Sequence, residues 1–154
     1  MGRLEQIWIK RAHRGLIDPA RKAVLEAGKG LLGSANYGGR RQVTIISVER
    51  WAELMVLLGA DIHPSARRAN LLVSGVELAE TRDRALRVGS CRLLIGGETR
   101  PCGRMEEARR LAGGDAKPLG WRGVGAGREW RRDSRRRRGR VGVVTRSTRL
   151  SSCR

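Results

Sequence analysis

The feature that most constrains the fold is a series of short apolar segments separated by glycines. Each segment is rich in β-branched or alternating apolar residues, which predicts strands at 6–10, 41–46, 70–73, 85–88 and 91–95. In the last of these, Cys91, Leu93 and Ile95 share one face, and a glycine pair follows, so we expect the strand to end there and Cys91 to lie in the core. Many short strands with two or three helices imply a closed or strongly curved sheet of α+β type.

Two segments carry helix signals. Asp18 and Pro19 offer an N-cap and a proline at the first helical position, which predicts a helix ending near Gly28. Residues 48–58 form the second predicted helix, because apolar side chains recur there at helical spacing before a glycine: Trp51, Leu54, Met55 and Leu58. This apolar stripe predicts packing against a core.

Cys102 is the thiol with the strongest chemical signal. Pro101 cannot donate to a sheet ladder, so a strand should stop before Cys102 and a helix should begin close behind it. A helix N-terminus and the nearby Arg100 and Arg104 would favour the thiolate over the thiol. The alternative is a half-buried structural cysteine, and the local sequence does not decide between the two.

Composition limits the other site classes. Cys91, Cys102 and Cys153 are too few and too scattered for a disulfide framework, and two histidines do not favour a zinc site made by protein ligands. The chain has no apolar run of membrane-spanning length, and its first residues lack the apolar core of a signal peptide. We therefore expect a cytoplasmic protein with no membrane partner.

The basic charge is concentrated near the C-terminus. The formal net charge is +18, yet residues 109–154 hold 15 Lys or Arg against 3 Asp or Glu. Residues 121–154 show neither strand nor helix periodicity, so we expect residues 109–154 to be a disordered basic tail that binds polyanions non-specifically. An alternative function is nucleic-acid binding through its arginine block, which consists of Arg131, Arg132, Arg135, Arg136, Arg137, Arg138 and Arg140.

Four stretches of the sequence carry a resemblance to a known family. They are Trp-Ile-Lys-Arg at 8–11, Gly-Gly-Arg-Arg-Gln-Val-Thr at 38–44, Arg-Arg-Ala-Asn-Leu-Leu-Val-Ser-Gly at 67–75, and Gly-Glu-Thr-Arg-Pro-Cys through Met-Glu-Glu-Ala at 97–108. Together they resemble the MOSC domain, the family named after the C-terminal domain of molybdenum cofactor sulfurase. The resemblance covers residues 7–108 and implies a β-rich barrel in residues 1–108. Many members have a histidine where this chain has Ala35-Asn36-Tyr37.

The resemblance also implies a site. Cys102 would carry sulfur as a persulfide or ligate the molybdenum cofactor (molybdopterin), with Arg68, Asn70 and Glu98 lining the same site. Sulfur transfer with a donor or acceptor protein is the implied activity, and the family is also associated with pyridoxal phosphate. The residues alone allow plainer roles: Arg68 could pair with a surface carboxylate, Asn70 could cap a turn, and Glu98 could bridge to Arg100.

Members of the family continue with a small helix and a final strand of approximately Gly-Glu-Ile-Arg-Val-Gly-Asp, which this chain lacks. Allowed codons for residues 131–140, read one base later, encode Gly-Glu-Ile-Arg-Val-Gly-Asp-Ala-Val. Residues 110–116 yield the small helix in the same way, and codons for Val144-Thr145 can hide a stop. Our hypothesis is that residues 109–154 are out of frame, which would leave the domain without its closing strand.

Overall fold

The computed structural model describes residues 2–99 and three later strands, for which it describes the backbone. One α-helix, one short 3-10 helix and eleven strands occur in these residues. In chain order they are β1 (Arg3–Lys10), β2 (Ile17–Ala20), β3 (Lys22–Glu26), β4 (Gly30–Leu31), β5 (Thr44–Ser47), α1 (Val48–Leu58), η1 (Pro64–Arg67), β6 (Leu71–Ser74), β7 (Ala85–Val88), β8 (Cys91–Glu98), β9 (Arg128–Trp130), β10 (Arg140–Val143) and β11 (Arg149–Cys153).

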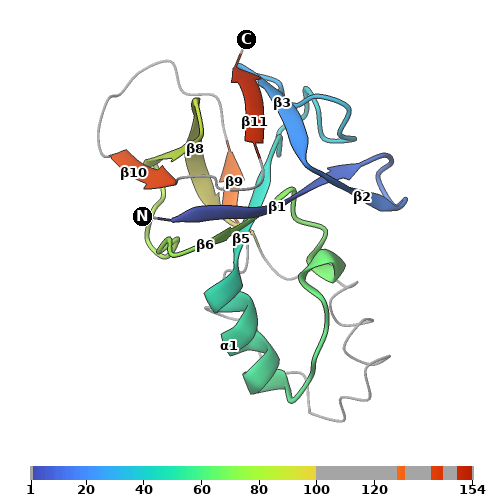
Figure 1. The fold of residues 1–154 in the computed structure, drawn as a ribbon, viewed down its shortest axis with the longest axis vertical. Coiled ribbons are helices and arrows are strands. Elements are labelled where there is room, and N and C mark those ends of the chain that lie inside the picture. The colour runs from blue at the N-terminus through green and yellow to red at the C-terminus, as the bar shows by residue number, and fades with distance from the viewer. Residues whose placement is uncertain (1, 100–127, 131–139, 144–148, 154) are drawn as a thin grey trace.

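The strands form two sheets. The larger has the order β10-β7-β8-β9-β5-β6-β1-β2, and the smaller has the order β11-β3-β4. In Figure 1 the strands lie in the upper part of the molecule and α1 lies below them. The prediction of a β-rich fold is confirmed. The predicted closed barrel is not seen, because among the described strands β10 and β2 lie at the two sides of the larger sheet and do not pair with each other.

Two apolar clusters make the core. The first joins both sheets, since Ala23, Leu25 and Leu31 pack with buried residues of β1, β5, β6, β7 and β8. Cys91 belongs to it and is fully buried, which confirms its predicted place in the core. The second cluster packs α1 on the larger sheet through Trp8, Ile46, Trp51, Leu54, Met55, Leu58, Ala69 and Leu72.

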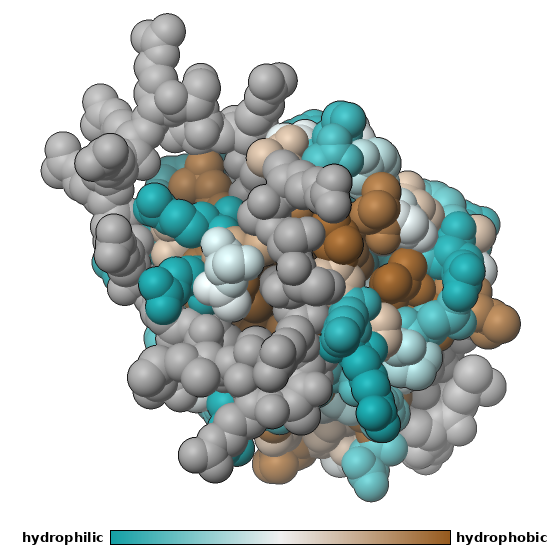
Figure 2. Space-filling view, turned by 45° about the horizontal axis from the view of Figure 1, so that its top comes forward, coloured by the Kyte–Doolittle hydropathy of each residue, from teal (hydrophilic) through white to brown (hydrophobic). Residues whose placement is uncertain are grey.

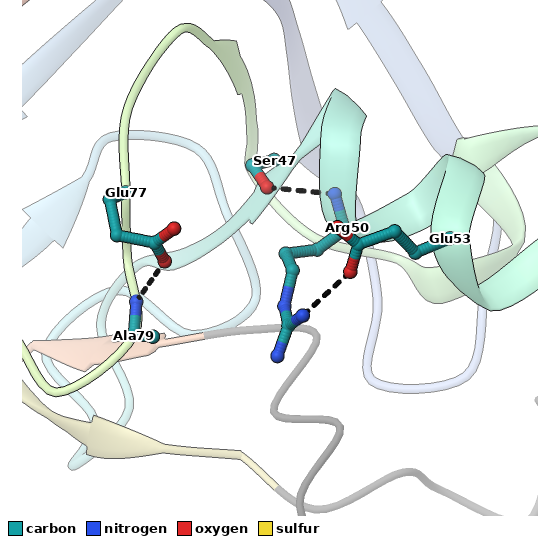
Figure 3. Close-up of polar contacts among 5 residues, drawn as sticks. All are labelled: Ser47, Arg50, Glu53, Glu77 and Ala79. Carbon is teal, nitrogen blue, oxygen red and sulfur yellow. Dashed lines mark hydrogen bonds and ion pairs between the residues drawn. The ribbon is translucent and has the colours of Figure 1, made fainter.

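Local sequence explains why α1 has the predicted bounds. The Ser47 hydroxyl accepts a hydrogen bond from the Arg50 amide at 3.2 Å, as expected of an N-cap, and Arg50 pairs with Glu53 at 2.6 Å (Figure 3). Gly59 ends the helix in the left-handed conformation, with φ of 59°. The same figure shows Glu77 accepting from the Ala79 amide at 2.8 Å in the connection to β7.

The helix predicted for residues 18–28 is wrong. This segment forms β2 and β3, and β2 pairs antiparallel with β1, with Trp8 opposite Pro19. Since β2 is an edge strand, Pro19 interrupts no interior ladder. Ala23 and Leu25 of β3 are buried in alternation, which is a strand pattern.

Strand β8 also differs from its prediction, because it continues through the glycine pair to Glu98. An irregularity in its pairing with β9 falls between Ile95 and Gly97, and glycine accommodates such a bulge. The strand ends at Glu98, before Cys102 as predicted. The helix predicted to begin behind Cys102 lies outside the described residues.

The segment predicted to be disordered contains three short strands. β9 pairs with β5 and β8, β10 pairs with β7, and β11 pairs with β3. Each uses backbone groups that would otherwise lie along an open strand edge. Valines in β10 also favour a strand.

Candidate functional site

The candidate residues Arg68 and Asn70 lie at one end of the strands of the larger sheet, which we call its edge. β1 runs antiparallel to β6, whereas β5 runs parallel to β6. The end of β1 therefore lies beside the starts of β5 and β6, and these three strands cross near the centre of Figure 1. Leu71 of β6 pairs with Ile7 of β1 and with Ile45 of β5, so these three residues lie side by side across the sheet.

Asn70 is the centre of a buried polar network at this edge. Its side chain is fully buried, and its Oδ1 accepts from the Thr44 amide and the Thr44 hydroxyl, each at 3.2 Å. Its Nδ2 donates to the Trp8 carbonyl at 3.2 Å and to the Ser34 hydroxyl at 3.3 Å. The amide is thus engaged by protein groups, which gives Asn70 a structural role; its predicted place in a ligand site stays a prediction.

Lys10 extends the network and was missed by sequence reasoning. Its side chain is 8% exposed, and its ammonium donates to the Thr44 hydroxyl at 3.2 Å. A buried cation is unusual unless polar groups surround it. A signal was present in the sequence, since Lys10 is two residues after Trp8 and shares its buried face of β1.

Arg68 follows η1 and holds the loop after β1. Its φ of 58° is left-handed, which is uncommon for a residue with a side chain. From this position its guanidinium donates to the Gly15 carbonyl and, at 3.3 Å, to the Ala12 carbonyl. Arg68 is half-buried and precedes Asn70 by two positions in sequence, so two predicted site residues share this connection.

Arg67 brings the end of β8 to the same connection. Its Nη2 donates to the Thr99 hydroxyl at 2.8 Å, and Thr99 is buried. Two strands, β9 and β5, lie between β8 and β6 in the larger sheet, so this contact spans the ends of strands that are not neighbours. Glu98, the last residue of β8, is exposed and is paired in register with Arg128. The sequence placed Arg67 in a motif but gave it no role.

Other predicted site residues lie outside the described part of the chain. Cys102 is one, and so are Arg131, Arg132, Arg135, Arg136, Arg137 and Arg138. Arg140 begins β10, of which the backbone is described. Within the described residues, no group of three or more His, Cys, Asp or Glu side chains could hold a metal ion.

Charge is uneven over residues 2–99, which hold 16 Lys or Arg and 10 Asp or Glu. The three segments at this edge, 10–18, 40–44 and 67–71, hold seven basic residues and one acidic residue, and the remainder holds nine of each. We call the seven basic residues the cationic edge: Lys10, Arg11, Arg14, Arg40, Arg41, Arg67 and Arg68. Asp18, the one acid, pairs with Arg11.

The connection from β4 to β5 is anchored next to this edge. The Tyr37 hydroxyl donates to Glu26, and the Lys29 ammonium lies 2.5 Å from the same carboxylate. Hydrogen bonds from Lys29 first, and then from Tyr37, lower the pKa of Glu26. The bond to Glu26 in turn raises the pKa of Tyr37.

Comparison with known proteins identifies the domain. The family model described as "MOSC domain" matches residues 33–151, which reaches beyond residue 108 into the basic segment. The YuaD protein of Bacillus subtilis has a similar solved structure, with a TM-score of 0.70 and 21% identity over 84% of this chain and 87% of that chain. No curated protein matches. In the part of this chain that the structure describes, no helix has the length and apolarity needed to cross a membrane. Because the family model matches most of its length, the chain belongs to the MOSC family.

Proposed function

We propose that this protein handles the molybdenum cofactor or its sulfur, and that Cys102 is the reacting thiol. Family membership supports a role related to the molybdenum cofactor. The observation that supports the proposal for Cys102 is the hydrogen bond from Arg67 to Thr99. Cys102 follows Thr99 by three residues in sequence, a reach of about 11 Å at most, and we propose that its thiol acts beside the η1–β6 connection that carries Arg68.

The residues present fit an anionic ligand in part. The cationic edge supplies positive charge for a pterin phosphate, and arginine forks suit phosphate oxygens. Arg67 and Arg68 are the members nearest Thr99 in the hydrogen-bonded structure. Asn70 fits less well, because its amide already binds Thr44, Trp8 and Ser34. The cofactor, when bound, would supply the metal, for which a thiolate is a suitable soft ligand.

Sulfur transfer needs no oxidant from this protein. The Cys102 thiolate attacks the terminal sulfur of a persulfide donor, a new sulfur–sulfur bond forms, and the donor departs as a thiolate. Positive charge from Arg67 and Arg68 nearby would stabilise the thiolate before attack.

The test uses the full chain with Cys153→Ser, treated with a persulfide donor and mapped by mass spectrometry. We expect one added sulfur atom on Cys102 and none on Cys91, which is fully buried. Molybdenum content after incubation with the cofactor is measured in parallel, with Cys102→Ala as the comparison. Equal sulfur on both cysteines, together with unchanged molybdenum content in Cys102→Ala, would leave Cys102 a structural residue.

A further inference from the structure

Two loops carry the outer part of the cationic edge. The 11–16 loop joins β1 to β2 and contains Arg11 and Arg14, and the 32–43 loop joins β4 to β5 and contains Arg40 and Arg41. All four arginine side chains are exposed. The remaining members of the edge, Lys10, Arg67 and Arg68, are buried or half-buried. Because the rest of residues 2–99 is electrically balanced, the net charge of this part of the protein is focused here.

Hydrogen bonds hold both loops against the end of β1. Arg68 binds two carbonyls of the 11–16 loop, as described above. In the 32–43 loop, the Ala35 amide donates to the Lys10 carbonyl at 2.7 Å, and Asn36 Nδ2 donates to the Arg41 carbonyl at 2.8 Å. The arginines are therefore presented by ordered backbone, which lowers the entropy that a partner would lose on binding.

Each loop also exposes a leucine. Leu16 is 81% exposed and Leu32 is 50% exposed. Apolar side chains reach the surface at several separate places on the face in Figure 2. These loops combine an exposed leucine with exposed arginines, the mixture found where an apolar contact is bordered by charged residues in protein interfaces.

The same loops offer few aromatic side chains that could stack on nucleic-acid bases, namely His13 and Tyr37. Tyr37 is their one Phe, Trp or Tyr residue, and its hydroxyl is held by Glu26. Single-strand binding relies on such aromatic platforms, whereas arginine forks recognise carboxylates equally well without them.

We propose that the 11–16 and 32–43 loops form a docking surface for a partner protein that presents acidic side chains around an exposed apolar residue. The exposed arginines of both loops attract the carboxylates, with Arg11 already paired with Asp18, and Leu16 supplies the apolar contact. The docking surface uses the outer arginines of the cationic edge, whereas Arg67 and Arg68 are the members proposed for the cofactor phosphate. It does not depend on whether Cys102 carries sulfur.

The probe is a synthetic peptide of glutamates around a central leucine pair, titrated into the 15N-labelled full chain. Amide shifts of the two loops give a local dissociation constant, which separates this surface from anion binding by the basic segment 109–154. The test variant is Arg14→Glu/Arg40→Glu. Its matched control is Arg87→Glu/Arg92→Glu, because these two exposed arginines face each other on β7 and β8 and the charge change is equal.

We expect the test variant to weaken local binding about tenfold or more, and the control to change it less than about twofold. Leu16→Ser should remove the preference for the leucine peptide over the same peptide with serines. The proposal is overturned if the loop amides do not shift, or if both charge variants weaken binding equally. It is also overturned if a short DNA duplex of the same charge shifts the loops as strongly as the peptide.

Discussion

Asn70→Ala tests the buried network in depth. The substitution removes four side-chain hydrogen bonds, to Thr44 twice, to Trp8 and to Ser34. Each is worth about 1 kcal/mol net, and the groups left behind lose partners in a buried place, so we expect a loss of about 3–5 kcal/mol in the free energy of unfolding. Small domains are stable by about 5–15 kcal/mol, so this loss is a large fraction.

The assay is equilibrium unfolding in urea, followed by the fluorescence of the buried Trp8 and Trp51. With a slope of about 2 kcal/mol per molar urea, the midpoint should fall by about 2 M. Asn36→Ala is the matched control, because its amide makes one hydrogen bond, to the Arg41 carbonyl at 2.8 Å, and we expect a loss of about 1 kcal/mol or less. If Asn70→Ala costs no more than Asn36→Ala, the network does not stabilise this edge.

Three further predictions concern pH, charge and the reading frame. The raised pKa of Tyr37 means that its bond to Glu26 stabilises the fold below the ordinary tyrosine pKa of about 10 and is lost as pH rises through the raised value; the stability gap between wild type and Tyr37→Phe should therefore close at high pH, and a constant gap would contradict this. DNA binding by residues 109–154 should fall steeply with salt and disappear when these residues are deleted; DNA binding that survives deletion would place a nucleic-acid site in the rest of the chain. The DNA encoding residues 110–144, read one base later, should give the missing MOSC strand and a stop near Val144, whereas stops throughout that frame would exclude the frameshift. Because the family model matches the chain as given through residue 151, the gene sequence decides between the two reading frames.

Local patterns predicted the elements whose signals are complete within one segment. The apolar spacing of residues 48–58 defined α1, and alternation defined β7 and buried Cys91. The signal at Asp18-Pro19 was also local, yet pairing with β1 overrode it, since Trp8 lies opposite Pro19. A strand pairing between residues eleven positions apart cannot be read from the propensities of either one.

The candidate site shows the same division. The motif stretches place Arg68 and Asn70 near one another, because they are two positions apart in sequence. Nothing local could show that Arg67 reaches Thr99, which lies 32 residues later, or that Lys10 turns its ammonium to Thr44. These contacts depend on how segments far apart in the sequence are arranged, which is a property of the whole fold.

The most direct test of the central claim is the rate at which Cys102 is alkylated near neutral pH, resolved by site in the Cys153→Ser protein. If the thiolate is stabilised by about one pKa unit, Cys102 should react about tenfold faster than an ordinary exposed thiol in a denatured control, while Cys91 stays protected. Arg67→Met should lower the Cys102 rate several-fold and raise its apparent pKa, whereas Arg82→Met, on the exposed connection before β7, should change neither. A Cys102 rate no faster than that of the denatured control, or one unaffected by Arg67→Met, would contradict the account of a positioned, activated thiol.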